Sequence, residues 1–242
     1  MFLGVDEAGR GPVLGPLVIG GLVCNDQEVL RELGVRDSKE LSPDRREALY
    51  SKLETAYYHC IMSVPASTID ISRSEMNLND LEVLCFSSVI ISILTGRSFR
   101  HPSIPGDVEM SLKGDGSGVD RIILDAADVN EERFGSRVSA EIRRFIGAEG
   151  AAIIARHKAD REHPVVGAAS ILAKVVRDRT IRKISQEAGV DIGSGYPSDD
   201  TTREFLIEHC RKNACFPPFA RASWDTCRKI TAVAAQRTLF DY

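Results

Sequence analysis

The chain of 242 residues lacks several features that mark particular classes of protein. Its six cysteines form no C-x-x-C pair and match no standard zinc module, so we expect them to be free and often buried. No apolar run approaches the roughly 20 residues that a membrane-spanning helix needs. The first residues, MFLGVDE, offer no basic stretch ahead of an apolar run, which argues against a signal peptide. We therefore expect a cytoplasmic protein.

An excess of positive charge is also missing, since the net charge is −4, and the total therefore does not indicate a nucleic-acid partner. The distribution of charge is more informative. Residues 171–185 hold five basic side chains against Asp178 alone, and residues 209–237 hold six against Asp225 alone. A basic C-terminal third beside acidic clusters fits a protein that binds both phosphates and metal, although two solvated helix faces would carry the same charges.

Apolar patterns predict an α/β protein. The five expected strands cover 2–5, 17–24, 59–64, 121–124 and 151–155. Helices are expected over 43–57, 80–94, 131–146, 166–188, 201–212 and 223–235, and a long loop over 97–119. The first three strands can pair as a meander, whereas a helix connects each later strand to its predecessor and makes it parallel. We therefore predict a five-stranded mixed sheet in the order 3-2-1-4-5, flanked by helices.

Acidic residues follow three of these strands. In the predicted order strands one and four are neighbours, so Asp6 and Asp125 should meet at their C-terminal ends, with Glu7 adjacent. Asp160 follows strand five closely enough to reach the same edge. Such carboxylates repel one another unless a cation lies between them, and Mg²⁺ or Mn²⁺ is the natural partner. Four carboxylates fit two ions about 3.5–4 Å apart, one activating water and the other stabilising the leaving oxygen.

Six ordered blocks of the sequence resemble ribonuclease HII in its archaeal style. They are DEAGRGP from Asp6, RDSK from Arg36, LDAADV from Leu124, HKAD from His157, PVVGAASILAKV from Pro164 and GSGYPSD from Gly193. The resemblance spans nearly the whole chain and implies a ribonuclease H-like fold. It also implies an endonuclease that hydrolyses the RNA strand of RNA–DNA hybrids and single ribonucleotides embedded in duplex DNA. The products would carry 5′-phosphate and 3′-hydroxyl ends.

The resemblance also implies roles for particular residues. Four acids are expected to bind metal and to be catalytic: Asp6, Glu7, Asp125 and Asp160. The loop Gly9, Arg10 and Gly11 is expected to recognise the ribose 2′-hydroxyl through its backbone, which glycine allows to approach a sugar. Tyr196 is expected to stack on the sugar at the RNA–DNA junction. Three further residues are expected near the substrate phosphates: Lys39, Ser170 and Lys174.

The last seven residues, QRTLFDY, resemble a peptide that binds a sliding clamp (PCNA), with Gln236, Leu239 and Tyr242 as its anchors. Such short patterns also occur by chance, and a frayed terminus would look the same. We accordingly expect three parts along a monomeric chain: a catalytic domain over 1–190, a helical substrate-binding region over 191–235 and a clamp-binding tail over 236–242. The expected loop over 97–119 looks like an insertion that could cover or extend the substrate groove.

Two alternatives stay open at the level of sequence. A DNA-cutting nuclease of the same fold would keep the acids but would need no loop that recognises a 2′-hydroxyl. A non-catalytic nucleic-acid adaptor that docks on the clamp would bind duplexes without ever cutting them. Cleavage of a duplex with one ribonucleotide, compared with an all-DNA duplex, separates these possibilities.

Overall fold

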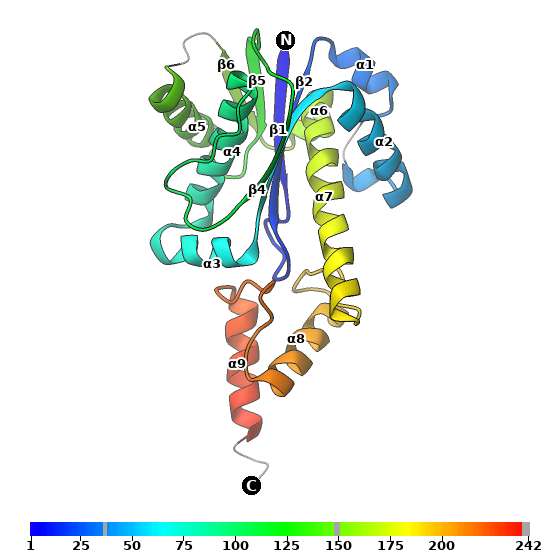
Figure 1. Ribbon diagram of the computed structural model, residues 1–242, viewed down its shortest axis with the longest axis vertical. Coiled ribbons are helices and arrows are strands. Elements are labelled where there is room, and N and C mark those ends of the chain that lie inside the picture. Colours follow the sequence, from blue (N-terminus) through cyan, green and yellow to red (C-terminus); the bar gives the residue numbers. More distant parts are fainter. Residues whose placement is uncertain (36–37, 148–150, 239–242) are drawn as a thin grey trace.

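The computed structural model describes residues 1–35, 38–147 and 151–238, apart from the side chains of Lys39 and residues 232–238. A mixed six-stranded sheet, in the order β4-β3-β2-β1-β5-β6, carries helices on both faces (Figure 1). Helices α8 (Asp200–Asn213) and α9 (Asp225–Thr238) extend from one end of this body. The α/β class predicted from the sequence is confirmed.

The centre of the sheet is β1 (Phe2–Ala8), which pairs antiparallel with β2 (Leu17–Cys24) and parallel with β5 (Arg121–Asp125). Outside these, β3 (Tyr58–Val64) pairs antiparallel with β2, and β6 (Ala152–Arg156) pairs parallel with β5. The order and direction of the five predicted strands are therefore confirmed. Their arrangement brings the C-terminal ends of β1 and β5 to the same edge of the sheet.

The predicted number of strands is wrong, because a sixth strand, β4 (Glu109–Lys113), pairs antiparallel with β3 inside the segment expected to be a loop. Its side chains alternate between half-buried and exposed, so β4 lacks the buried apolar run by which the other strands were recognised. The strand order places β4 at the outer edge, separated from β1 by β3 and β2. This part of the segment extends the sheet and lies far from the acidic strand ends.

The longer helices begin and end within a few residues of their predicted bounds. They are α2 (Pro43–Ala56), α4 (Leu78–Thr95), α5 (Glu131–Ile146), α7 (Pro164–Ala188), α8 (Asp200–Asn213) and α9 (Asp225–Thr238). Three shorter helices were not predicted: α1 (Gln27–Glu32), α3 (Ala66–Glu75) and α6 (Ala159–Glu162). The start of α2 shows why local signals succeed, since the Ser42 side chain accepts a hydrogen bond from the Arg45 amide and Pro43 occupies the first turn.

Helix α7 lies directly on the sheet. An added Cβ on Gly4 of β1 would come within 2.4 Å of the Val165 backbone, and one on Gly20 of β2 within 2.5 Å of the Ala169 carbonyl oxygen. These glycines let α7 pack in contact with the strands and so fix its residues relative to the end of β1. The apolar side chains of α7 form one core with strand residues such as Val18 and Leu22. The opposite face is covered by α4 and α5, whose apolar side chains form a second core with Leu3 and Val5.

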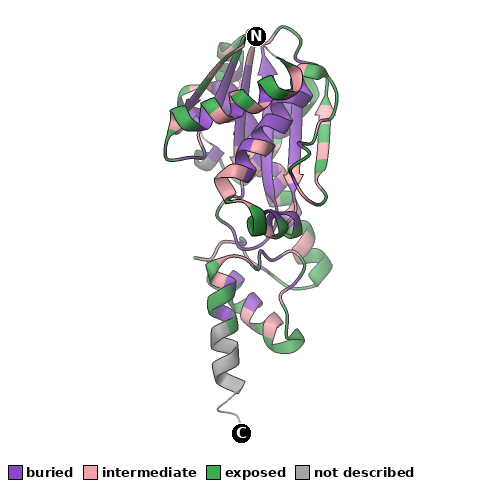
Figure 2. Ribbon diagram, turned by 90° about the vertical axis from the view of Figure 1, so that its left-hand side faces the viewer, coloured by how far each residue is buried: buried purple, intermediate pink, exposed green. Residues whose placement is uncertain are grey.

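Helix α4 has the length and apolar composition of a membrane-spanning helix, which the sequence analysis did not expect of any segment. In the structure, 72% of this helix is buried inside the protein, where it packs on the sheet. Figure 2 shows the same distribution, with buried residues concentrated in the sheet and its covering helices. All six cysteines are free as predicted, and four are buried: Cys24, Cys60, Cys85 and Cys227.

A third, smaller core joins the C-terminal helices to the rest of the chain. It combines Leu206 of α8 with Ile181 near the end of α7 and with Val13 and Leu14, which follow β1. Backbone pairing adds to this contact, because Leu14 forms an isolated β-bridge with Ala220. The C-terminal region is therefore attached to the segment that leads out of β1.

Replacing Gly4 with alanine should destabilise the protein, because the new methyl group would overlap the α7 backbone. We expect the free energy of unfolding to fall by about 1–3 kcal/mol, as measured by urea denaturation. Gly135→Ala serves as the control, since its Cβ would meet the Ala155 side chain at 3.2 Å and come no closer than 3.8 Å to the backbone of that residue. Equal stability of Gly4→Ala and wild type would contradict the close contact of β1 with α7.

Candidate active site

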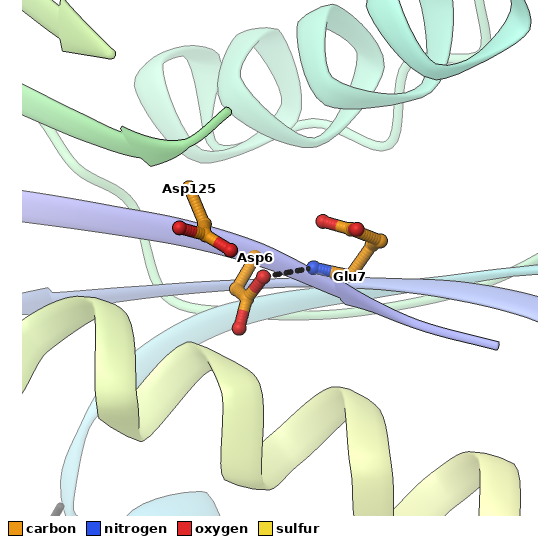
Figure 3. Close-up of side chains that lie close together, drawn as sticks. All are labelled: Asp6, Glu7 and Asp125. Carbon is orange, nitrogen blue, oxygen red and sulfur yellow. Dashed lines mark hydrogen bonds between the residues drawn. The ribbon is translucent and has the colours of Figure 1, made fainter. Parts of the chain in front are cut away.

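Three carboxylates meet where β1 and β5 end. Asp6, Glu7 and Asp125 each offer an oxygen, and these oxygens all lie within 4.8 Å of one another (Figure 3). The parallel register sets Val5 opposite Leu124, so the residues that follow them reach the same level. Because side chains alternate along a strand, Asp6 and Glu7 point to opposite sides of β1. Figure 3 shows Asp6 directed toward the helix coloured as α7 and Glu7 directed toward the other face.

The site is electrostatically strained. Burial raises the pKa of Asp6 well above its usual value, and the neighbouring charges of Glu7 and Asp125 raise it further. Burial raises the pKa of Glu7 to about 8, with Glu82 and Asp125 adding to the effect. The Glu7 amide donates a 2.7 Å hydrogen bond to Asp6 Oδ1, which offsets part of this cost. Glu7 Oε2 is buried without a hydrogen-bond partner among the described residues, so the donor set fits a hard divalent cation.

Asp160, the fourth predicted acid, lies in α6 and is 5% exposed. It is not part of the group of three whose oxygens lie within 4.8 Å of one another. The chain nevertheless links it to that group, because the amide of the preceding residue, Ala159, donates a 2.8 Å hydrogen bond to Asp125 Oδ1. The structure thus brings Asp6, Glu7 and Asp125 together. Asp160, the fourth acid, directly follows the residue whose amide contacts Asp125.

A cavity of about 370 Å³ opens beside the acids. Most of the residues predicted to form the site line it: Asp6, Glu7, Gly9, Arg10, Gly11, Asp125, Ser170, Lys174 and Tyr196. Ala8 and Ser38 complete the wall. The acidic strand ends, the glycine-containing loop and one side of α7 therefore face a common space, in which a substrate would touch all three.

The loop from Gly9 to Gly11 requires glycine at its first position. Gly9 has a φ of +90°, and an added Cβ would come within 2.5 Å of the Pro16 carbonyl oxygen. Tyr196 lies beside the other end of the loop, since a Cβ on Gly11 would be 3.7 Å from its ring. Backbone hydrogen bonds hold this arrangement, because the Gly195 carbonyl accepts from the amides of both Val13 and Leu14.

The Arg10 side chain turns toward the protein. Its guanidinium donates to the Ala127 carbonyl and, at 2.6 Å, to Asn79 Oδ1. It also lies 3.1 Å from Glu82 Oε2, although neither oxygen of this fully buried carboxylate has a hydrogen-bond partner, so the pair is a contact of charges. Burial raises the pKa of Glu82 to about 8, while Arg10 opposes the rise. Sequence reasoning missed Asn79 and Glu82, which belong to α4 and stand in no recognisable motif.

Polar and basic residues of α7 line the opposite wall. Ser170 lies 3.0 Å from Ser38, oxygen to oxygen, and also hydrogen-bonds Asp6. Lys174 donates a 2.7 Å hydrogen bond to Asp178. Asp178 also contacts Arg177, which belongs to the basic stretch 171–185, and Arg46, which sequence reasoning missed. Three cations surround this one carboxylate, and Lys174, the one of the three that lines the cavity, is suited to contact a phosphate.

The remaining predicted residues are described only in part. Lys39 belongs to a short 3₁₀ turn (Ser38–Glu40), and its side chain lies outside the described residues. Gln236 falls within the part of α9 (residues 232–238) whose side chains are likewise not described. Leu239 and Tyr242 lie outside the described residues. The structure therefore gives no test of the clamp-binding anchors.

Paired acids at the ends of parallel neighbouring strands, beside a glycine-containing loop and a positive helix face, define a metal-dependent nuclease with a ribonuclease H-like fold. The family model for ribonuclease HII matches residues 3–107 and 100–227, and the chain belongs to that family. Its members are ribonuclease H enzymes, endonucleases of RNA–DNA hybrids that depend on divalent metal ions. The predicted family, fold class and enzyme class are confirmed.

Individual relatives support this assignment over nearly the whole chain. Ribonuclease HII of Methanocella arvoryzae is 39% identical over 100% of this chain and 96% of its own length. That of Thermococcus onnurineus is 44% identical, covering 94% and 88%. The crystal structure of ribonuclease H2 from Pyrococcus horikoshii is similar with a TM-score of 0.79 at 39% identity, covering 97% of this chain and 99% of that one. A PCNA–RNase HII complex from Archaeoglobus fulgidus contains a similar chain, with a TM-score of 0.76, 30% identity and full coverage of both chains.

The raised pKa of Glu7 predicts that stability depends on pH when metal is removed by a chelator. A carboxyl group with a folded-state pKa of about 8, against 4.5, favours folding fully below pH 4.5, and this contribution is lost as the pH rises toward 8. We therefore expect Glu7→Gln to raise the free energy of unfolding at pH 8 by on the order of 1 kcal/mol, with little change at pH 5. Urea denaturation in EDTA measures both.

Glu204→Gln, an exposed position on α8, provides the control and should follow wild type at both pH values. If Glu7→Gln were no more stable than wild type at pH 8, the strain assigned to the buried carboxylates would be absent.

Proposed function

We propose that this chain cuts the RNA strand of RNA–DNA hybrids and also single ribonucleotides embedded in duplex DNA, at the cavity beside Asp6, Glu7 and Asp125. One observation carries the proposal. The three carboxylates, of which Asp6 is buried and the other two half-buried, share a cavity with the backbone of the Gly9–Gly11 loop. Acids suited to phosphate chemistry therefore lie beside groups suited to a sugar hydroxyl. A nuclease that ignores the sugar would have no use for the second feature.

We propose Mg²⁺ or Mn²⁺ as the metal, with two ions in the working enzyme. Asp6, Glu7 and Asp125 would hold them, with Asp160 as a fourth ligand from α6. When bound, the ions supply positive charge at the scissile phosphate and lower the pKa of water. The strained carboxylates support this proposal, since their mutual repulsion would fall on binding.

The chain's own residues would bind and orient the substrate around that centre. Lys174, which lines the cavity and shares Asp178 with Arg46 and Arg177, suits a backbone phosphate. Tyr196, beside Gly11, offers a ring face on which a sugar could pack. The ring is held from behind, because the buried Arg177 lies 5.1 Å from its centroid and donates a 2.5 Å hydrogen bond to the Ser194 carbonyl.

We also propose that the C-terminal tail binds the sliding clamp through Gln236, Leu239 and Tyr242. The Archaeoglobus fulgidus relative is described in complex with PCNA, and it matches this chain over its full length. Helix α9 runs away from the sheet (Figure 1), so a clamp bound at its end would leave the cavity open. We propose that the enzyme works as a monomer, with 1–190 as the catalytic domain and 191–235 as a substrate-binding region.

Cleavage of a DNA duplex that carries one ribonucleotide tests the catalytic proposal. With Mg²⁺ or Mn²⁺, we expect wild type to cut beside the ribonucleotide and to leave an all-DNA duplex intact. Asp125→Asn should lower kcat by at least about 100-fold while duplex binding persists, because it removes a carboxylate that holds the metal. Gel mapping of products and anisotropy of labelled duplexes measure these quantities, with Glu204→Gln as the control. Cutting of both duplexes at similar rates would favour the DNA nuclease, and the absence of cutting would favour the adaptor.

Removal of residues 236–242 tests the clamp proposal separately. We expect the truncated protein to lose binding to the cognate sliding clamp in calorimetry while cutting short duplexes at the wild-type rate, because the tail would supply the apolar anchors. Substitution of Arg237 alone, which is not one of the anchors, is the matched control. Unchanged clamp affinity after truncation would contradict the proposal.

A further inference from the structure

Arg221, in the segment between α8 and α9, is fully buried. Arginine rarely occupies such a position without a charged partner, because removing a guanidinium from water is costly. Here its hydrogen bonds go to main-chain carbonyls. Nη2 donates to Gly9 at 2.6 Å, Nη1 to Arg10 at 3.1 Å and Nε to Gly15 at 3.0 Å.

The segment that carries Arg221 is held on both sides. The Arg221 amide donates to the Val13 carbonyl at 2.8 Å, and the Gly15 amide donates to Phe219 at 2.8 Å. On the other side, Asp70 of α3 accepts hydrogen bonds from Ser223 and from the Ala222 amide, the latter at 2.7 Å. The guanidinium is therefore placed by its surroundings before any substrate arrives.

The geometry of the peptide bond determines where the amides that follow these carbonyls point. In a trans peptide the carbonyl and the following N–H lie in one plane and point in opposite directions. Because Arg221 holds the carbonyls of Gly9 and Arg10 inward, the amides of Arg10 and Gly11 point away from the buried guanidinium. Gly11 is exposed and lines the cavity. Within the described part of the chain, neither amide donates to a protein acceptor, so two adjacent donors are available to a ligand.

We propose that Arg221 is a positioning residue for ribose recognition: by holding two consecutive carbonyls of the loop, it aims the Arg10 and Gly11 amides at the 2′-hydroxyl. This inference rests on the proposed function, which assigns the loop to the sugar. Burial lowers the pKa of Arg221 to about 9, with Asp70 and Glu82 opposing the shift, so the guanidinium keeps its charge at neutral pH. The C-terminal region thereby contributes to substrate choice through the loop.

Arg221→Lys and Arg221→Met in the full-length protein test the inference. Lysine keeps the charge but lacks the planar fork that spans two carbonyls, and methionine removes the donors. Arg211→Met, at an exposed position on α8, is the matched control. Affinities for a one-ribonucleotide duplex and for the same all-DNA duplex are measured in the Asp125→Asn background, where the substrate persists. Cleavage rates at saturating substrate are measured without that change, and hydrogen exchange follows residues 9–15.

In both Arg221 variants we expect the ratio of affinity for the ribonucleotide-containing duplex to affinity for the all-DNA duplex to fall about tenfold. Affinity for the all-DNA duplex should stay within about twofold of wild type. We expect kcat to fall about 100-fold, since misplaced positioning groups have effects of that size, and the loop amides to exchange faster. Arg211→Met should match wild type. If Arg221→Met does not fold, Arg221→Lys decides.

Two results would overturn the inference about Arg221 without contradicting the proposed function. One is an Arg221→Lys protein that keeps the wild-type preference and kcat. The other is an equal loss of affinity for both duplexes with kcat unchanged, which would show a purely structural link. If wild type itself neither cuts nor prefers the ribonucleotide-containing duplex, the proposed function fails and the inference fails with it.

Discussion

The repulsion between the buried and half-buried carboxylates at the ends of β1 and β5 is the constraint on which the site depends. Parallel pairing of these strands forces Asp6 and Asp125 to the same level, and Glu7 follows on the same strand. Burial then makes their charged forms costly, which raises the pKa values of Asp6 and Glu7. The fold gives up some stability in the metal-free state, and a bound cation would recover it. Carboxylates with raised pKa values cluster at functional sites.

The sequence alone predicted the central sheet and most of the residues that line the cavity, and each of these predictions has a physical basis. Continuous apolar runs bounded by Gly and Pro mark buried strands such as β2, and the rule on parallel crossovers then orders them. Edge strand β4 was not predicted, because a half-exposed strand carries no such apolar run. Helix α3 was not predicted because its start carries no capping side chain: Pro65 stands at the N-cap position, directly after β3. The order of the strands in turn predicted the meeting of Asp6 and Asp125.

Contacts made by buried charges were beyond prediction because they depend on three-dimensional packing between distant segments. Glu82 and Asn79 of α4 hold the side chain of Arg10, and Arg221 holds the carbonyls of the same loop from more than 200 positions away in the chain. The charge count of the C-terminal third included Arg221 among groups suited to phosphates, whereas the structure buries it beneath the loop. The loop is thus held by one arginine of its own and by one from the C-terminal region.

Metal binding by the carboxylates is the central claim, and anomalous X-ray scattering tests it most directly. Crystals of the full-length protein soaked in Mn²⁺ would be measured at the manganese absorption edge. The account predicts an anomalous peak among the carboxylates of Asp6, Glu7 and Asp125, and its loss when Asp125 is replaced by Asn. Well-ordered carboxylates with no anomalous peak between them, at millimolar Mn²⁺, would contradict it.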